Sequence, residues 1–173
     1  DLEHIERSIP FLNANLNKRG IVLDLTDASD AATFASLLVT TDLFVESTPP
    51  GHLGAMGFDD AWFWNANPDL VIVSISPFGQ WGPYSSYRGN DAVAAAMSGI
   101  MTNQGDDSRS PVVLPCQMSY QIAAIEAACL GLAGIRHRRS TGHGQRIDVS
   151  LQEALTFANV QSVARYSQRS EIV

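Results

Sequence analysis

The residues that could do chemistry in this sequence are few. Asp91 follows Gly89-Asn90 and precedes an alanine-rich run. A carboxylate there either accepts free amide hydrogens of the helix or acts as a nucleophile, and the structural role is favoured. Glu126 falls well inside a longer predicted helix. We expect it at a packing edge or in contact with a partner.

Two cysteines and four histidines are the other candidates. Cys116 and Cys129 have neither metal-binding nor redox spacing, so we expect buried thiols of a reducing, cytoplasmic compartment. Cys116 could accept an acyl group, but no histidine or basic run stands beside it to activate the thiol. The histidines follow no metal-ligand pattern, and no metal site is predicted. They are His4, His52, His137 and His143.

The composition narrows the class of protein. The 173 residues suit one domain, with 45% hydrophobic and 17% charged residues. A net charge of -7 disfavours nucleic acid as a partner. We expect no segment apolar enough to span a membrane. The chain begins with Asp1 rather than Met and shows no signal peptide, so we expect a fragment of a longer protein.

Short apolar runs alternate with helical stretches along the chain. The predicted strands are Gly20–Leu25, Asp42–Glu46, Leu70–Ser76 and Gln145–Val149. The main predicted helices are 31–39, 57–64, 91–101, 119–137 and one that Ser150 caps. This order predicts an α/β fold with a doubly wound, Rossmann-like parallel sheet. Residues 1–19 read as an irregular lead-in, so the sheet is expected to be incomplete at its N-terminus. Trp62 and Trp64 are expected to be packing or dimer contacts rather than ligand-binding residues.

Five ordered segments resemble the motifs of the family III coenzyme A transferases, the CaiB/BaiF group. They are Asn15–Leu25 (NLNKRGIVLDL), Asp42–Gly51 (DLFVESTPPG), Asn67–Tyr84 (with SISPFGQWGPY), Ala95–Gly99 (AAMSG) and His137–Ser150 (HRRSTGHGQRIDVS). Each motif alone is weak, but the ordered set is specific. The resemblance implies that residues 1–173 form part of the large coenzyme A-binding domain, without the family's smaller domain.

Members of this family move coenzyme A between carboxylic acids, and an aspartate is the nucleophile. The resemblance places that aspartate near Tyr120, at the start of the alanine-rich helix. Residues 114–121 read LPCQMSYQ and contain neither Asp nor Glu. Asp91 is a weak substitute. Whether this chain is itself an enzyme is therefore left open by the sequence.

The resemblance also implies contacts to coenzyme A. The residues at the matching positions are Leu23, Ser47, Thr48, His52, Met56 and Arg88. The family's Asn-Phe pair is replaced by Ser47-Thr48, so stacking on an aromatic ring is lost while backbone contacts remain available. Arg88 could meet a phosphate through charge-assisted hydrogen bonds, or be an ordinary solvated arginine.

Several functions remain open at this point. One is transfer of coenzyme A on acyl-CoA thioesters. A second is a non-catalytic, coenzyme A-binding or dimerising half of a fused transferase, since the family forms interlocked homodimers. An acyl-CoA racemase has less support, because Gly89-Asn90-Asp91 replaces the family's Gly-His-Asp. An unrelated α/β ligand-binding domain is disfavoured by the ordered motifs.

Overall fold

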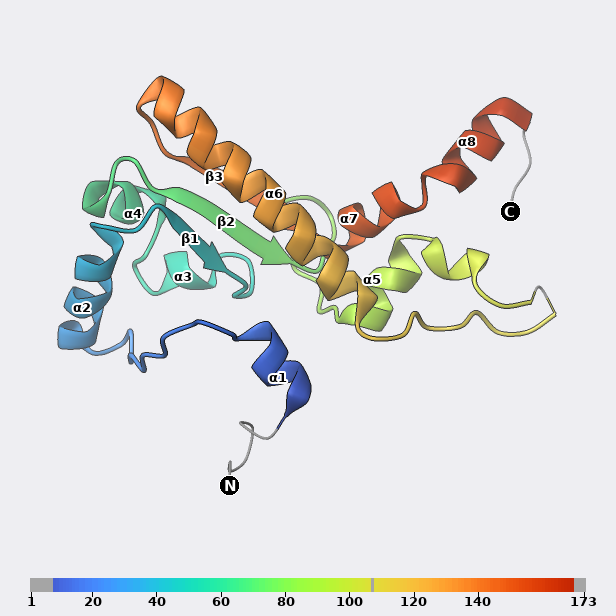
Figure 1. The fold of residues 1–173 in the computed structure, drawn as a ribbon, viewed down its shortest axis with the longest axis horizontal. Coiled ribbons are helices and arrows are strands. Elements are labelled where there is room, and N and C mark those ends of the chain that lie inside the picture. The colour runs from blue at the N-terminus through green and yellow to red at the C-terminus, as the bar shows by residue number, and fades with distance from the viewer. Residues whose placement is uncertain (1–7, 107, 170–173) are drawn as a thin grey trace. The chain divides into compact units, whose positions relative to one another are not determined.

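The computed structural model describes residues 8–106 and 108–169 (Figure 1). The chain divides into two compact units, residues 1–34 and residues 35–173. The sheet and most of the helices belong to the second unit.

The first unit contains a helix but lacks a predicted strand. Helix α1 (Ile9–Ala14) lies in the lead-in that was expected to be irregular, and the Ser8 hydroxyl accepts the amide hydrogen of Phe11 at its start. The predicted strand Gly20–Leu25 is wrong: the segment is irregular, and Val22 is 96% exposed. A parallel strand is stabilised by its neighbours, and no described strand pairs with this segment.

Helix α2 (Ala28–Leu38) begins in the first unit. The Asp27 carboxylate accepts amide hydrogens from Ser29 at 2.8 Å and from Asp30 at 3.2 Å. Asp27 therefore caps this helix. The Asp30 carboxylate instead accepts the amide hydrogen of Asp24 at 2.8 Å.

The second unit is organised around a sheet of three parallel strands. They are β1 (Leu43–Glu46), β2 (Val71–Ser76) and β3 (Gln145–Ser150), in the order β1-β2-β3. In β2, residues 71–74 and 76 are buried, as is typical of a strand covered on both faces. The parallel order confirms the predicted fold class.

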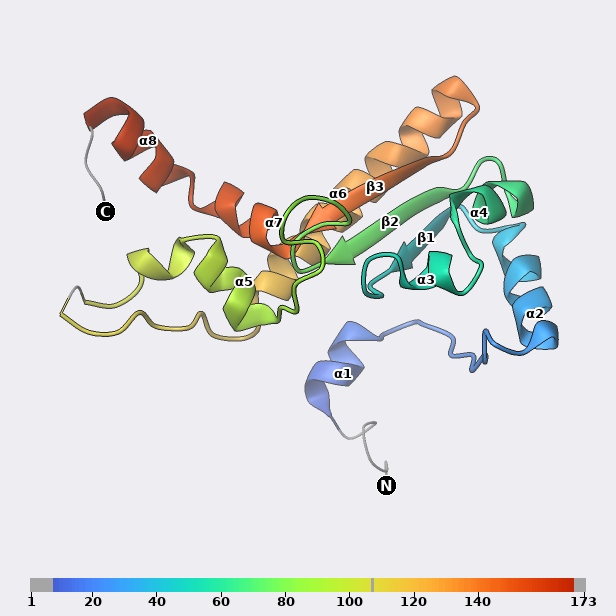
Figure 2. The same cartoon turned by 180° about the vertical axis from the view of Figure 1, so that it is seen from behind.

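The long helix α6 (Met118–Thr141) covers one face of the sheet (Figures 1 and 2). Its buried positions are all small residues: Ser119, Ala123, Ala127, Gly131 and Gly134. A methyl group on Gly134 would come within 2.8 Å of a methyl carbon of Val71, and one on Gly131 within 3.0 Å of Leu43. The small residues therefore let the helix backbone lie close to the strands.

The opposite face of the sheet packs against aromatic residues of α4 (Asp60–Ala66), which follows the short helix α3 (His52–Ala55). Phe44 of β1 stacks on Phe63 of α4 with ring centroids 5.1 Å apart. Trp62 meets Phe63 edge to face, and the Trp64 indole donates to the Leu70 carbonyl at 3.2 Å. Both tryptophans are packing residues, as expected. Helices on both faces make the sheet doubly wound.

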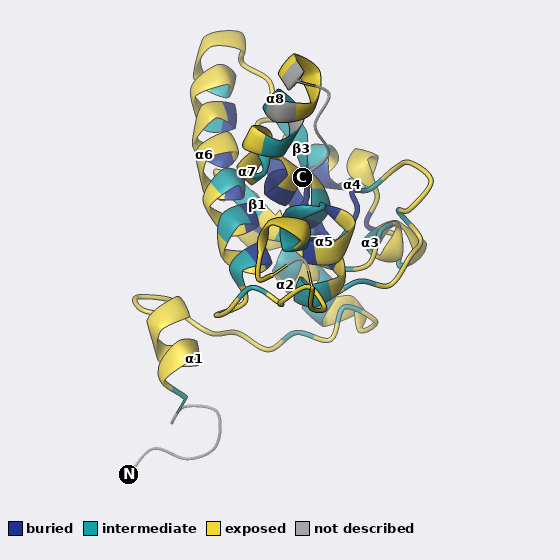
Figure 3. Cartoon of the chain, turned by 90° about the vertical axis from the view of Figure 1, so that its right-hand side faces the viewer, coloured by how far each residue is buried: buried dark blue, intermediate teal, exposed yellow. Residues whose placement is uncertain are grey.

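The carboxyl end of the second unit is helical. It contains α5 (Asp91–Met97), a 3-10 turn η2 (Ile100–Asn103), α7 (Leu151–Ala158) and α8 (Val160–Arg169). The Ser150 hydroxyl accepts the Glu153 amide hydrogen at 3.3 Å, which confirms the predicted cap. The helix predicted over 91–101 breaks instead at Gly99, which has a φ of 78°. Figure 3 shows the buried residues where α5, α6 and α7 meet the sheet.

Helix α6 also corrects the expectation about membrane spans. By length and composition alone it is apolar enough to cross a bilayer, and it is the one such helix in the described part of the chain. Ala123, Ala127, Gly131 and Gly134 are buried on its sheet side, so α6 is a sheet-covering helix of the α/β fold.

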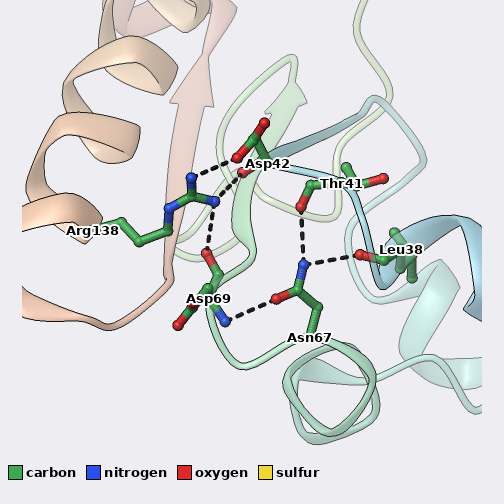
Figure 4. Close-up of polar contacts among 6 residues, drawn as sticks. All are labelled: Leu38, Thr41, Asp42, Asn67, Asp69 and Arg138. Carbon is green, nitrogen blue, oxygen red and sulfur yellow. Dashed lines mark hydrogen bonds and ion pairs between the residues drawn. The ribbon is translucent and has the colours of Figure 1, made fainter.

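Arg138 ties the amino ends of the strands together (Figure 4). Its guanidinium lies 2.5 Å from the Asp42 carboxylate and donates to the Asp42 and Asp69 carbonyls at 3.4 Å. The hydrogen bond from Arg138, followed by its charge, lowers the pKa of Asp42. The ion pair links the last turns of α6 to the residue that precedes β1.

Asn67 forms a second link at the same end of the sheet (Figure 4). Its amide nitrogen donates to the carbonyls of Leu38 at 2.9 Å and Thr41 at 3.0 Å, while its amide oxygen accepts from the Asp69 nitrogen at 3.0 Å. The Asn67 side chain thus forms hydrogen bonds with backbone carbonyls at and after the end of α2 and with a backbone amide in the turn before β2.

We expect Asp42→Asn to reduce the acid sensitivity of the fold. Because the pKa of Asp42 is lower in the folded chain, its contribution to stability is present above the unfolded pKa and is lost as pH falls through the folded value. Urea unfolding at a series of pH values from 7 downwards measures this slope. Asp69→Asn, which removes no side-chain hydrogen bond recorded in the described structure, is the control. Equal slopes for Asp42→Asn and the unmodified chain would contradict the expectation.

Candidate functional site

The face of the sheet that packs on α4 becomes polar toward the carboxyl ends of the strands. Side chains alternate between faces, so Phe44 and Ile72 share this face with Ser74 and with Arg146 and Asp148 of β3. Ligands of open parallel sheets bind at the carboxyl ends of the strands. These residues were not among the predicted site residues, although polar side chains at every second position of the strands were the available signal.

Arg146 connects all three strands and α4. Its guanidinium donates to the Asp60 carboxylate at 2.8 and 2.5 Å and to the Ser74 hydroxyl at 2.5 Å. It also lies 3.9 Å from the Glu46 carboxylate, whose side chain is only 7% exposed. The second oxygen of Glu46 accepts from the amide and hydroxyl of Thr48 at 2.8 and 2.6 Å. A buried acid is therefore neutralised by one arginine and held by the loop after β1.

Asp148 holds the loop that follows β2. One of its carboxylate oxygens accepts the Gln80 amide hydrogen at 2.7 Å. Gly79 has a φ of 86°, and a methyl group there would lie 3.2 Å from the same oxygen. Three buried side-chain atoms, on β2, on the loop after it and on β3, have no hydrogen-bond partner among the described residues: Ser76 Oγ, Gln80 Nε2 and the other oxygen of Asp148. Buried polar atoms usually have a hydrogen-bond partner, so these three atoms are available to bond with water or a polar ligand.

A cavity of about 510 Å³ opens beside this polar face. It is lined by the loop after β1, by α3 and α4, and by Gln80 and Arg146. Three acids, Glu46, Asp59 and Asp60, line it with the single cation Arg146. The cavity therefore suits neutral, hydrogen-bonding groups better than phosphates.

The residues that were predicted to contact coenzyme A are only partly gathered here. Thr48 lines the cavity, and Ser47 is exposed on the same loop. His52 is exposed at the start of α3, and Met56 is half-buried at its end. Arg88 is exposed on the loop before α5. Leu23 belongs to the first unit. The contacts of all six residues with coenzyme A stay predictions.

The position of the expected nucleophile lies in the first turn of α6. Tyr120 is 42% exposed, and that turn contains no acid. The nearby carboxylate is that of Asp91, which accepts the Ser119 amide hydrogen at 2.9 Å, while the Ser119 hydroxyl donates to the Asp91 carbonyl at 2.9 Å. Asp91 thus satisfies a free amide, as expected, although the amide belongs to α6 and not to its own helix α5.

The cysteines differ from the prediction. Both Cys116 and Cys129 are exposed, so the expectation of buried thiols is wrong. Cys116 lies in the bend before α6 with a φ of 59°, and Cys129 lies on α6 away from the sheet. The described ranges, 8–106 and 108–169, contain no cluster of three or more residues that could ligate a metal.

The parallel sheet, its covering helices and the polar residues near the carboxyl ends of the strands define an α/β protein of the doubly wound class. The model of CoA-transferase family III matches residues 2–172, and the chain belongs to that family. The crystal structure of a CAIB/BAIF family protein from Brucella suis superimposes with a TM-score of 0.86 and 25% identity, over 90% of this chain and 41% of that one.

Curated relatives agree with this assignment. Subunit BbsE of succinyl-CoA:(R)-benzylsuccinate CoA-transferase from Thauera aromatica is 34% identical over 89% of this chain. Formyl-CoA:oxalate CoA-transferase from Streptomyces avermitilis is 33% identical over 90% of it. The probable CoA-transferase Rv1866 from Mycobacterium tuberculosis is 36% identical over 87%. The matched segments span only 38%, 37% and 19% of these three relatives.

Proposed function

We propose that this chain is the coenzyme A-binding part of a transferase that moves coenzyme A between carboxylic acids. The family match over residues 2–172 is the observation that carries the proposal. The cavity at the carboxyl ends of the parallel strands supports it, because that edge is where such sheets hold nucleotide-like ligands. The substrate class is an acyl-CoA thioester.

The residues around the cavity fit the neutral portions of coenzyme A. Gln80, which lines the cavity, has an unused donor at Nε2. The acids that line the cavity disfavour the phosphates there. Arg88, exposed on the loop before α5, would meet a phosphate outside the cavity. The other predicted contacts, on residues 47–56, would flank the cavity.

A second proposal concerns which part of the transferase binds coenzyme A and which part supplies the nucleophile. No acid stands in the first turn of α6, and the Asp91 carboxylate already accepts the Ser119 amide hydrogen. Some relatives are named as subunits, among them BbsE and the alpha subunit of a succinyl-CoA–L-malate CoA-transferase from Chloroflexus aurantiacus. These observations support a non-catalytic, coenzyme A-binding half. A second polypeptide or a fused second half would then supply the nucleophile, in a cytoplasmic assembly.

Mass spectrometry after mixing the chain with succinyl-CoA tests this division. We expect no covalent adduct, because Tyr120 replaces the nucleophilic carboxylate. Cys116→Ser and Cys129→Ser remove the two thiols that could react by acyl exchange. An adduct that survives both changes and disappears in Asp91→Asn would contradict the proposal and identify Asp91 as the nucleophile.

A further inference from the structure

The cavity beside the polar face of the sheet has two walls that come from different parts of the chain. Residues within 46–54, from the end of β1 through the following loop into α3, form one wall. Residues 58–61, at the start of α4, form the other. Arg146 of β3 and Gln80 also line the cavity. The contacts that hold the two walls in place therefore determine the shape of the cavity.

The loop of the first wall is held at its start by Glu46. One carboxylate oxygen of Glu46 accepts hydrogen bonds from both the amide and the hydroxyl of Thr48, at 2.8 and 2.6 Å. The Glu46 side chain is only 7% exposed, and hydrogen bonds to a carboxylate are among the strong ones. The single hydrogen of the Thr48 hydroxyl is therefore used inside the loop.

The same loop is closed at its other end by a β-turn. The His52 amide donates to the Pro49 carbonyl at 3.0 Å. Pro50 and Gly51 occupy the two central positions, and Gly51 has a φ of 76°. Proline followed by a residue with positive φ is the pattern of a type II turn. Since the two prolines also restrict the backbone, the loop has few conformations left once Glu46 fixes its start.

Arg146 joins this wall to the other one. Its guanidinium lies 3.9 Å from the other oxygen of Glu46 and 2.5 Å from the carboxylate of Asp60 at the start of α4. The neighbouring Asp59 carboxylate accepts the Trp62 amide hydrogen at 2.8 Å, so it caps α4 instead. A single cation thus contacts one acid from each wall of the cavity.

We propose that Glu46 is a positioning residue for ligand binding, which holds residues 47–51 in the conformation that forms one wall of the cavity. Glu46 acts through Thr48, and Arg146 ties the held loop to Asp60 of the opposite wall. A ligand that meets a preformed wall does not lose binding free energy to ordering the loop. The inference rests on the proposed function only for the identity of the ligand, an acyl-CoA thioester.

Amide hydrogen exchange tests the position of the loop without any ligand. In Glu46→Ala the Thr48 amide loses its acceptor and should exchange about tenfold faster, whereas the amides of β2 should keep their rates. Arg146 keeps Asp60 as a partner, so no uncompensated charge is left. Glu46→Gln, whose amide oxygen can still accept both Thr48 hydrogens, should stay within about threefold of the unmodified chain. Glu153→Ala, at an exposed position outside the cavity lining, is the matched control.

Isothermal titration with coenzyme A measures the consequence for binding. Glu46→Ala should raise Kd about tenfold, and Glu46→Gln should keep it within about threefold of the unmodified value. Thr48→Val removes only the hydroxyl bond and should raise Kd about threefold. Adding Thr48→Val to Glu46→Ala should raise Kd no further, because the two side chains act through one contact. If Glu46→Ala does not fold, Thr48→Val and Glu46→Gln carry the comparison.

Three results overturn the proposal. The first is a Thr48 amide that exchanges no faster in Glu46→Ala than in Glu153→Ala. The second is equal acceleration of Thr48 and the β2 amides, since the substitution would then act on the whole fold. The third is an unchanged Kd in a variant whose loop exchanges faster. If the unmodified chain does not bind coenzyme A, the proposed function fails, and the exchange rates alone decide whether Glu46 holds the loop.

Discussion

Gly144→Ala should destabilise the second unit by about 3 kcal/mol or more. A methyl group at this position would lie 2.2 Å from the carbonyl oxygen of Leu70 and 2.9 Å from the carbonyl carbon of Asp69. These are backbone atoms at the start of β2, so no side-chain rotation relieves the clash. The Gly144 amide also donates to the Pro68 carbonyl at 3.1 Å, and separating the two segments would lose that bond.

Urea unfolding at neutral pH measures this effect. Gly54→Ala is the matched control, because a methyl group there meets nothing within 4 Å. Gly54 lies within the short helix α3, where alanine is favoured over glycine by up to about 1 kcal/mol. The control should therefore be neutral or slightly stabilising. If Gly144→Ala unfolds at the same urea concentration as the control, the close approach of the two backbones is wrong.

Arg146→Ala should cost about 3 kcal/mol of stability. The substitution removes the cation that faces Glu46, and the Glu46 side chain is only 7% exposed. It also removes the hydrogen bonds to Asp60 and Ser74. Breaking a buried pair from one side leaves the other charge uncompensated, which costs more than the pair itself contributes.

A double mutant separates the charge from the packing. Combining Arg146→Ala with Glu46→Gln should recover about 1 kcal/mol or more, because the orphaned charge is gone. Arg109→Ala, at an exposed position with no recorded side-chain bond, should change stability by less than about 0.5 kcal/mol. No recovery in the double mutant would show that Glu46 is not the group that Arg146 neutralises.

Isothermal titration of the unmodified chain with coenzyme A, compared with Gln80→Ala, tests the cavity as a binding site.

Most helices and strands were predictable because the sequence patterns that indicate them lie within short stretches of the chain. Apolar β-branched runs mark β2 and the neighbouring strands, and Ser150 caps α7 through its own side chain. The small residues of α6 recur at helical spacing, which is itself a local signal of close backbone packing. The strand predicted at Gly20–Leu25 failed because strand formation depends on a partner, and none of the described strands pairs with it.

The site was less predictable because its parts are far apart in the chain. Arg146 and Glu46 are separated by a hundred residues. The parallel register places Arg146 level with Phe44 on the same face of the sheet, and its side chain reaches Glu46 two residues further along β1. The exposure of Cys129 likewise depends on which side of α6 faces the strands. The contact of Asp91 with Ser119 joins two helices whose relative placement no local pattern encodes.

The sequence by itself determined the α/β alternation, the family resemblance and the absence of an acid around Tyr120, since these are properties of residue order. The tertiary structure decided which polar side chains share the carboxyl edge and which face of α6 is left uncovered. Long-range pairing and burial are set by the whole packed unit, so they do not appear in any short stretch of residues.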